Sequence, residues 1–303
     1  MAKKYWPKEV KKINKLLKSN SWYETIMKEL KVSEYLAKEI LRKWEAWIIE
    51  EYLPPKILIV DIETAPMEVY TWWLWNQTMW TDQIKEDWFM LCWSAKWLFW
   101  NTIEKWVLNK KELTKKDDRR ISKDLWKLMD EADIVIAHNW DAFDIKKMNA
   151  RFIKHWLWVP SPYQTIDTLK VAKRWFRMTS NKLDYLCRFL WVWWKIDTGW
   201  FELWKKAVEW DMWALWKMVI YCMNDVVILE NLYIKLRPYI KWHPNLNLYW
   251  EWERCSNCWS EDIKWKYKYR SNTTVFECWK CQDCWAYIRR SSASKITKIR
   301  NAK

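Results

Sequence analysis

The chain contains 33 tryptophans and one glycine among its 303 residues. An average protein has roughly 7% glycine. Glycine is favoured in tight turns, at helix ends and in metal knuckles, because it tolerates positive φ. Trp259 and Trp285 each directly follow a Cys-x-x-Cys pair, and Trp156 follows a predicted helix. Trp140 lies in a predicted turn that precedes the same helix. The sequence therefore predicts that these tryptophans occupy positions suited to glycine.

We interpret most of the tryptophans as glycines of the natural protein. Some bacteria and their phages read the codon UGA as glycine, whereas a common alternative translation table reads it as tryptophan. A genuinely tryptophan-rich protein is the alternative, and an intact mass several kilodaltons below that of the printed sequence would exclude it. Tryptophans in aromatic-rich strands or helices are expected to be genuine, as at Trp88, Trp93, Trp97 and Trp175.

The composition favours a globular protein with a polyanionic partner. The hydrophobic fraction is 51%, the formal net charge is +15 and the isoelectric point is about 9.3. Such an excess of basic residues is typical of nucleic-acid-binding proteins. We expect no membrane span, because no apolar run approaches about 18 residues, and no secretion signal follows the basic N-terminus. These features predict a cytoplasmic location in a bacterial cell or a phage-infected host.

The chain divides into four predicted regions. Residues 1–52 have helical periodicity, with 12 Lys and Arg against 8 acidic residues, and Pro54-Pro55 forms a linker after them. Residues 56–238 combine strands with alternating helices, which predicts an α/β sheet with helices on its faces. Residues 243–290 form a cysteine-rich module, and residues 291–303 form a basic tail.

The N-terminal region resembles a helix-turn-helix of DNA-binding proteins over the segment YETIMKELKVSEYLAKEILRK. Lys31 stands in this segment where the turn usually carries glycine. A helical hairpin used for packing or protein contacts is the alternative. In the central region we expect strands over residues 56–61, 88–98 and 133–137, and helices over residues 119–131, 143–155, 181–190 and 212–236.

Three short motifs place carboxylates at the ends or along the faces of these elements. Asp61 and Glu63 follow the first apolar strand, where side chains two residues apart share a face. Two carboxylates held that close are unfavourable unless a cation lies between them. Asp144 lies at the start of the helix over residues 143–155. Asp225 lies in the long apolar helix over residues 212–236, where a carboxylate calls for an explanation; a solvent-facing side chain is the alternative to a functional one.

Two further residue patterns accompany these carboxylates. Asn139 and Phe143 precede Asp144 in the turn from strand to helix. Tyr221 precedes Asp225 by four residues, so the two side chains share one face of their helix. Asp167, in the segment TIDT, is interpreted as a structural or capping residue, with a role in the site as the alternative.

The ordered set D-x-E, N-x-x-x-F-D and Y-x-x-x-D resembles the three motifs of the DnaQ-like, DEDD-type 3′–5′ exonucleases with tyrosine in the third motif. The resemblance covers residues of about 56–238 and implies a ribonuclease H-like mixed sheet flanked by helices. It also implies two Mg²⁺ or Mn²⁺ ions, which suit oxygen ligands. The implied metal ligands are Asp61, Glu63, Asp144 and Asp225.

The resemblance implies a role for each of these residues. Asp61 would bridge both ions, with Glu63 and Asp225 on the first ion and Asp144 on the second. Tyr221 would orient the attacking water, since a phenol with an ordinary pKa of about 10 is a donor rather than a strong base. Asn139 and Phe143 would contact the substrate.

The cysteines fall into two groups. Three of them, Cys92, Cys187 and Cys222, lie in apolar segments and are expected to be buried thiols. The other five crowd into the C-terminal region: Cys255, Cys258, Cys278, Cys281 and Cys284. In a chain with no secretion signal, such a cluster indicates metal ligation rather than disulfides.

The cysteine spacing predicts a zinc ribbon. Cys255 with Cys258 and Cys281 with Cys284 form two knuckles separated by 22 residues, and four thiolates suit one structural Zn²⁺. Cys278 with Cys281 is an equally valid knuckle, and we favour Cys284 because Trp285 then follows it as Trp259 follows Cys258. Strands are expected over residues 263–269 and 273–277. Basic and tyrosine side chains there could contact a nucleic-acid backbone: Lys264, Lys266, Tyr267, Lys268, Tyr269 and Arg270.

The sequence thus predicts a metal-dependent 3′–5′ exonuclease, with a single-stranded 3′ end of DNA as the favoured substrate. An RNA-processing exonuclease on the same fold is one alternative. A non-catalytic DNA-binding protein that uses the nuclease fold as a scaffold is another. The sequence identifies no protein partner in replication or repair.

Overall fold

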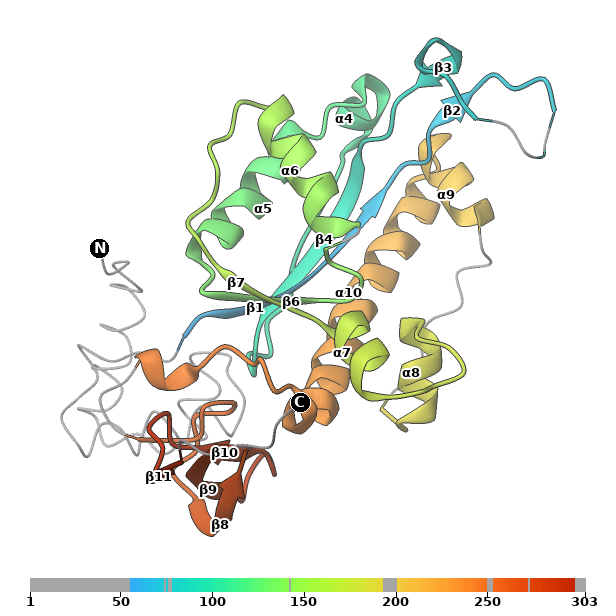
Figure 1. Ribbon diagram of the computed structural model, residues 1–303. Coiled ribbons are helices and arrows are strands. Elements are labelled where there is room, and N and C mark those ends of the chain that lie inside the picture. The colour runs from blue at the N-terminus through green and yellow to red at the C-terminus, as the bar shows by residue number, and fades with distance from the viewer. Residues whose placement is uncertain are drawn as a thin grey trace, which may run out of the picture.

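The computed structural model describes residues 55–73, 75, 78–141, 143–192, 201–249, 253–271 and 273–297. The predicted helix-turn-helix lies outside these residues. The described chain has two parts, a large α/β region and a small C-terminal sheet (Figure 1).

A mixed five-stranded sheet in the order β5-β4-β1-β6-β7 forms the centre of the α/β region. β1 (Ile57–Thr64) pairs antiparallel with β4 (Met90–Trp97), which pairs antiparallel with β5 (Glu104–Val107). On its other side β1 pairs parallel with β6 (Ile134–Ala137), which pairs parallel with β7 (Gln164–Asp167). The predicted α/β class is therefore confirmed, and β1 lies at the middle of the sheet.

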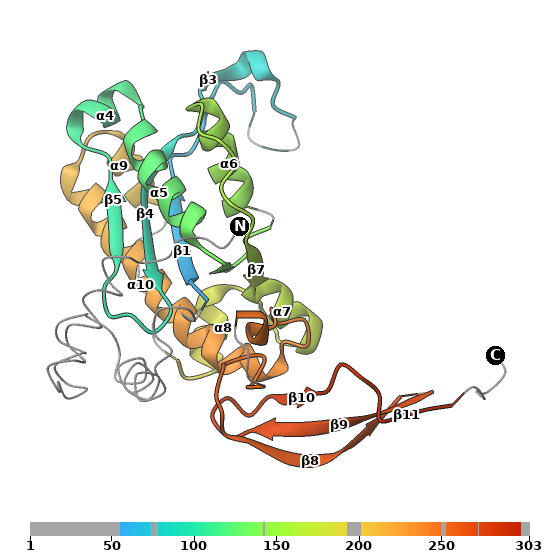
Figure 2. The same cartoon turned by 90° about the vertical axis from the view of Figure 1, so that its left-hand side faces the viewer.

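Helices cover both faces of this sheet (Figures 1 and 2). α5 (Arg119–Glu131) and α6 (Asp144–Lys154) lie on one face, and α10 (Met212–Leu236) runs along the other. The first four residues of β1 are buried, as expected of a central strand covered on both faces. The smaller helices are α4 (Lys110–Lys115), α7 (Thr168–Trp175), α8 (Leu183–Phe189) and α9 (Phe201–Val208).

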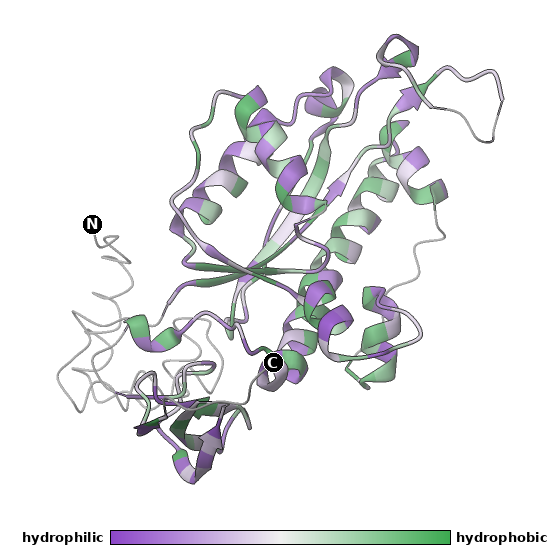
Figure 3. Cartoon of the chain, in the orientation of Figure 1, coloured by the Kyte–Doolittle hydropathy of each residue, from purple (hydrophilic) through white to green (hydrophobic). Residues whose placement is uncertain are grey.

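The helix α10 is long and largely apolar. The segment Met212–Tyr239 is long and apolar enough to cross a membrane by length and composition, and half of its most apolar stretch is buried in the fold. Figure 3 shows the apolar residues of the sheet and of α10. Glu230 forms a buried ion pair with Lys96 of β4, and its carboxylate also accepts a hydrogen bond from the amide of Phe99 at 2.8 Å. These contacts fix α10 against the sheet.

The C-terminal part is a four-stranded antiparallel sheet with β9 at its centre (Figure 2). β9 (Thr274–Cys281) pairs with β8 (Ile263–Arg270), β10 (Tyr287–Arg289) and β11 (Lys295–Ile296). β9 is longer than the predicted strand, because its register with β8 runs on to Cys281. β11 lies inside the predicted basic tail of residues 291–303, so part of that tail is a strand of the ribbon.

The ribbon packs on the C-terminal end of α10. Trp259 is only 6% exposed and belongs to the main hydrophobic core. The side-chain amide of Asn257 donates to the carbonyl oxygen of Arg237 at 3.3 Å. His243, which lies between Arg237 and Asn257 in the sequence, is also buried. Its Nε2 lies 2.8 Å from the hydroxyl of Tyr233. The two predicted domains therefore share a packed joint, which the sequence boundary at residue 243 did not anticipate.

Short elements complete the fold. Two strands, β2 (Glu68–Val69) and β3 (Ile84–Glu86), form a separate two-stranded sheet near the C-terminal end of β1. The short 3-10 helices are η1 (Thr81–Gln83), η2 (Arg237–Tyr239) and η3 (Leu246–Tyr249).

Eight described residues other than glycine have positive φ, and five of them are tryptophans: Trp156, Trp191, Trp210, Trp259 and Trp285. This backbone region costs an ordinary L-residue roughly 1–2 kcal/mol, because Cβ approaches the following carbonyl oxygen. Trp140 differs from the prediction. It is fully buried and is not among the residues with positive φ, and the left-handed residue of its turn is Asn139, with φ 65°.

One tryptophan expected to be genuine is well accommodated. Trp93 lies in β4, is fully buried, and donates from its indole nitrogen to the carbonyl oxygen of Ile121 at 2.7 Å. The indole nitrogen of Trp140 is also buried and has no hydrogen-bond partner among the described residues. Among the described residues, the fold therefore supplies a hydrogen-bond acceptor for the indole nitrogen of Trp93 but not for that of Trp140.

Candidate metal centres

The first carboxylates of the site lie at the C-terminal end of β1. Asp61 and Glu63 face Ser94 and Cys92 of β4 in the strand register. Ile62, between them, points the other way and is 3% exposed. The alternation of a strand therefore puts both carboxylates on one face of the sheet, as the sequence predicted.

A third carboxylate reaches these two from α10. Asp225 is 4% exposed, and its ligand atom lies with those of Asp61 and Glu63 in a group whose members are all within 4.8 Å of one another. We call this group the acidic centre. The thiol of Cys222 donates to the backbone carbonyl of Asp61 at 3.4 Å, which ties α10 to β1 almost one turn before Asp225. Three carboxylates at this separation can share a divalent cation.

Tyr221 lies one helical turn before Asp225 on the same face of α10. The Tyr221 ring is half-buried and meets Trp204 of α9 edge to face, with the ring centroids 6.0 Å apart. This packing fixes the ring while its hydroxyl shares the helix face of the acidic centre.

The structure does not include Asp144 in the acidic centre. Asp144 begins α6 and is 6% exposed. Burial, with a smaller contribution from the charge of Asp167, raises the pKa of the Asp144 carboxyl to about 7. Lys147, one turn later, donates to Thr64 at the end of β1 at 3.0 Å. The first turn of α6 therefore lies beside the strand end that carries Glu63.

Lys147 is a cation near this site that the sequence prediction missed. Its ammonium lies 4.7 Å from the ring centroid of Phe143 and 4.3 Å from that of Trp88. Burial lowers the pKa of Lys147, and the charges of Asp87 and Asp144 oppose that shift. Its position three residues after Asp144 on a helix could have pointed to it, because side chains at that spacing share a face.

The other residues of the second motif surround the turn after β6. The amide of Asn139 donates to the Asp167 carboxylate at 3.0 Å, and the amide of Leu169 donates to the same oxygen at 2.9 Å. Asp167 is thus the N-cap of α7 and also fixes the turn, in line with the capping role expected of it. Phe143 is 41% exposed, so its ring is accessible.

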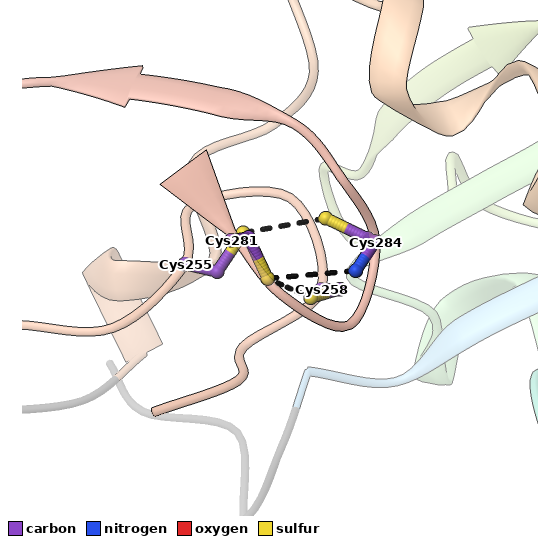
Figure 4. Close-up of side chains that lie close together, drawn as sticks. All are labelled: Cys255, Cys258, Cys281 and Cys284. Atoms are coloured by element: carbon purple, nitrogen blue, oxygen red, sulfur yellow. Dashed lines mark hydrogen bonds between the residues drawn. The ribbon is translucent and has the colours of Figure 1, made fainter. Parts of the chain in front are cut away.

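The second centre consists of four buried cysteines (Figure 4). The sulfur atoms of Cys255, Cys258, Cys281 and Cys284 all lie within 4.8 Å of one another. Two of the sulfur pairs, Cys255 with Cys284 and Cys258 with Cys281, are 3.5 Å apart. We call this group the cysteine centre.

The backbone around these cysteines has the form of two knuckles. The amide of Trp259 donates to the carbonyl of Cys255 at 2.8 Å, and the amide of Cys284 donates to the Cys281 sulfur at 3.5 Å. Trp259 and Trp285, directly after the two pairs, both have positive φ. Four convergent buried sulfurs on such turns fit a tetrahedral Zn²⁺ with no open position.

Cys278 lies apart from the cysteine centre. It stands in the middle of β9, opposite Tyr267 of β8 and Arg289 of β10. Burial raises the pKa of the Cys278 thiol. Cys92, Cys187 and Cys222 are buried, as predicted.

A third group of acidic and histidine side chains has another explanation. Asp117, Asp118 and His155 also lie within 4.8 Å of one another. The Asp118 carboxylate is fully buried and contacts Arg151 and His155 at 2.5 Å each. Its second oxygen accepts from the amide of Met90 at 2.8 Å. These partners already compensate the Asp118 charge, so the group holds α5 and α6 to β4.

No family model and no curated protein matches this sequence. Among solved structures, the chain is similar to the family B DNA polymerase from the hyperthermophilic archaeon Pyrobaculum calidifontis. The sequence identity is 13%, the TM-score is 0.45, and the match covers 74% of this chain and 34% of that chain. The matched part is thus about a third of the length of that polymerase, and the likeness is too low to carry a functional conclusion.

Proposed function

We propose that the chain is a metal-dependent 3′–5′ exonuclease of the DnaQ-like, DEDD type with tyrosine in its third motif. The observation that carries the proposal is the convergence of Asp61, Glu63 and Asp225, from β1 and α10, within 4.8 Å of one another. These are the first and third motifs of that family. The mixed sheet with helices on both faces supports the ribonuclease H-like fold that the family implies.

The chemistry of the acidic centre suits phosphodiester hydrolysis. Asp61, Glu63 and Asp225 supply hard oxygen ligands for divalent cations, and Asp144 supplies a fourth carboxylate from the neighbouring α6. When bound, two Mg²⁺ or Mn²⁺ ions activate a water and stabilise the leaving 3′ oxygen. The hydroxyl of Tyr221 orients that water.

The residues around the acidic centre bind the substrate. Lys147 contributes a positive charge beside the end of β1, where it faces a phosphate of the bound strand. The accessible ring of Phe143 offers a stacking surface for a terminal base. DNA is the favoured substrate, and the cysteine centre holds one structural Zn²⁺.

The test uses single-stranded DNA and RNA of the same sequence, each labelled at the 5′ end, with Mg²⁺ or Mn²⁺. We expect a ladder of products that shortens one nucleotide at a time from the 3′ end. The Asp225→Asn variant should lose both this ladder and Mn²⁺ binding measured by calorimetry. Glu202→Gln, which alters an exposed carboxylate of α9, should change neither.

Three results would redirect this proposal. Hydrolysis of RNA alone would identify an RNA-processing exonuclease. Nucleic-acid binding without hydrolysis under either metal ion would identify a non-catalytic binding protein. Internal cleavage products would show an endonuclease rather than an exonuclease.

A further inference from the structure

One face of the ribbon sheet gathers aromatic rings and cations that neither metal centre uses. Directly opposite residues of an antiparallel pair point to the same face. Lys264 of β8 and Tyr287 of β10 each lie directly opposite Lys280 of β9, so all three side chains point to the same face of the sheet. The complete set, which we call the tyrosine face, is Lys264, Tyr267, Tyr269, Phe276, Cys278, Lys280, Tyr287 and Arg289.

A β-bulge in β8 creates this face. In the register Trp265 lies opposite Trp279 and Tyr267 lies opposite Cys278, so Lys266 is the extra residue. Without the bulge, alternation would separate the tyrosines of β8 from Lys264. The bulge instead brings Lys264 and the tyrosines to one side. It also moves Lys268 and Arg270 to the opposite side, away from the cations with which the sequence grouped them.

The rings on the tyrosine face form a connected surface. Tyr267 and Tyr287 meet edge to face with their centroids 5.9 Å apart, and Tyr269 lies 6.3 Å from Phe276. The Arg289 guanidinium lies 4.0 Å from the centroid of the Phe276 ring. These contacts hold the rings in place while leaving their outer surfaces open.

The tyrosine face is exposed and positively charged. Tyr267 is 42% exposed, Tyr269 is 44% exposed and Tyr287 is 52% exposed. Glu277 is the only acidic residue of β8, β9 and β10, all of whose residues are described, and the register puts it on the opposite face. There Glu277 contacts Arg290 at 3.6 Å. The tyrosine face thus combines flat aromatic rings with the cations Lys264, Lys280 and Arg289.

We propose that the tyrosine face binds single-stranded nucleic acid. Unpaired bases stack on Tyr267, Tyr269 and Tyr287, since every base has a flat face that an aromatic ring can cover. Cations between the rings, Lys264, Lys280 and Arg289, contact the phosphates. The strand register places no tryptophan on this face, and the neighbouring Trp285 contacts it at Lys280, whose ammonium lies 4.4 Å from the ring centroid. The use of the tyrosine face for holding the exonuclease substrate rests on the proposed function, whereas the binding itself does not.

The experiment measures binding of a fluorescein-labelled dT oligonucleotide of about 12 nucleotides by fluorescence anisotropy. The full chain is used without added divalent ions and without chelator, which prevents hydrolysis and retains zinc. We expect the double variant Tyr267→Ala/Tyr287→Ala to bind at least roughly tenfold more weakly. The double variant Tyr267→Phe/Tyr287→Phe should bind like the wild type, because stacking requires the ring and not the hydroxyl.

A matched pair of charge variants tests the assignment of faces. Arg289→Ala should weaken binding and flatten its salt dependence, because fewer phosphate contacts release fewer counterions. Lys268→Ala, on the opposite face, should have the smaller effect. Zinc content and melting temperature, measured for every variant, show whether the ribbon remains folded.

Each outcome supports or overturns the proposal. Wild-type binding by a zinc-loaded Tyr267→Ala/Tyr287→Ala protein would overturn it, as would equal losses for Arg289→Ala and Lys268→Ala. Binding of a duplex as tight as that of the single strand would also overturn it. Tyrosine-dependent binding with no hydrolysis in Mg²⁺ would refute the exonuclease alone, and hydrolysis with tyrosine-independent binding would refute the tyrosine face alone.

Discussion

The cysteine centre and the acidic centre are assembled in opposite ways. The four cysteines lie within thirty residues, and each Cys-x-x-Cys pair sits on a single turn whose backbone makes its own hydrogen bonds. The acidic centre depends instead on α10 docking against β1, more than 150 positions away in the sequence, through contacts such as that of Cys222 with Asp61. One centre is local in the chain, and the other exists only when the whole α/β region has folded.

This difference determines how each centre responds to damage. A zinc site contributes its binding energy directly to the folding of a small ribbon, so removal of a ligand unfolds the ribbon. Removal of a carboxylate from the acidic centre relieves repulsion between like charges and leaves the α/β core intact. The joint between the two parts, at Tyr233 and His243, is the path by which damage to one could reach the other.

The largest effect is expected from loss of a zinc ligand. Structural zinc sites have binding free energies of roughly 10–16 kcal/mol at neutral pH, so Cys284→Ser should abolish zinc binding and unfold the ribbon. Metal analysis should give about one zinc per wild-type chain and none in this variant. Cys278→Ser is the matched control and should retain the zinc, because Cys278 lies outside the cysteine centre.

The same variant tests whether the two centres are independent. With saturating substrate, Cys284→Ser should keep much of its hydrolytic rate if the acidic centre needs only the α/β region. A complete loss of turnover, with the α/β region still folded by circular dichroism, would show that the ribbon is part of the catalytic unit. Zinc loss in Cys278→Ser alone would show that the ligand set is wrong.

The next largest effect is expected at the start of α6, beside the end of β1. Asp144→Ala should reduce Mg²⁺-dependent hydrolysis by roughly 10³-fold or more, because each metal ion supplies several kcal/mol of transition-state stabilisation. Zinc content and thermal stability should stay near the wild-type values. Turnover close to that of the wild type would exclude Asp144 from the metal site and leave the three carboxylates of the acidic centre as the whole of it.

The joint between the centres should weaken in acid. Burial lowers the pKa of His243 from 6.5 to about 4. Below pH 6.5 the His243 imidazole becomes protonated in the unfolded chain, whereas in the folded chain it stays neutral down to about pH 4. The free energy of unfolding therefore falls as the pH is lowered from 6.5 to 4. The loss is about 3 kcal/mol by pH 4. Denaturant titrations between pH 7 and pH 4 measure this loss of stability. The His243→Gln variant should lack the contribution. If its free energy of unfolding depends on pH as that of the wild type does, the effect belongs to another group.

The accuracy of the sequence predictions follows the same division between local and long-range structure. The helices predicted over residues 119–131 and 212–236 match α5 and α10 residue for residue. Periodicity defines both of them, and Asp211 caps the second by accepting from the amides of Trp213 and Ala214. The short elements β5, β7, α7 and α9 were missed. The strands β5 (EKWV) and β7 (QTID) lack the continuous apolar run that identified β6 (IVIA).

The site shows the same limits. The cysteine knuckles could be predicted because their ligands are spaced along one turn. The sequence could name Asp61, Glu63 and Asp225, but their proximity depends on the docking of α10. Lys147 was missed because its contact with Thr64 joins two distant segments. The sequence named Lys264, Tyr267 and Tyr269 as candidate nucleic-acid contacts. It grouped them with Lys268 and Arg270, which the single bulge residue Lys266 places on the opposite face.

A smaller effect is expected at Tyr221. Tyr221→Phe keeps the ring that packs on Trp204 and removes only the hydroxyl. The loss of one hydrogen bond to the attacking water should lower the hydrolytic rate by about tenfold. Single-turnover kinetics should show this loss in the chemical step with substrate affinity unchanged. A loss as large as that of Asp144→Ala would show that the tyrosine does more than orient water.

The smallest effect compares a knuckle tryptophan with a strand tryptophan. Trp285 follows the second cysteine pair, is 59% exposed and has a φ of 64°. Replacement by glycine removes a backbone strain of roughly 1–2 kcal/mol. It also forfeits a contact with Lys280, which lies 4.4 Å from the ring centroid, worth roughly 0.5 kcal/mol at an exposed site. Trp285→Gly should therefore stabilise the ribbon by about 1 kcal/mol.

Trp93 is the control for this comparison. It lies opposite Ile62, the residue between Asp61 and Glu63 in β1. Its side chain is fully buried, and the indole nitrogen donates a hydrogen bond to the carbonyl oxygen of Ile121. Trp93→Gly should destabilise the α/β region by at least roughly 3–5 kcal/mol, the cost of emptying a large core site. Denaturant titrations of both variants give the two signs. Opposite signs support glycine as the natural residue at the knuckle and tryptophan in the strand, whereas destabilisation by both would remove the physical basis for the recoding interpretation.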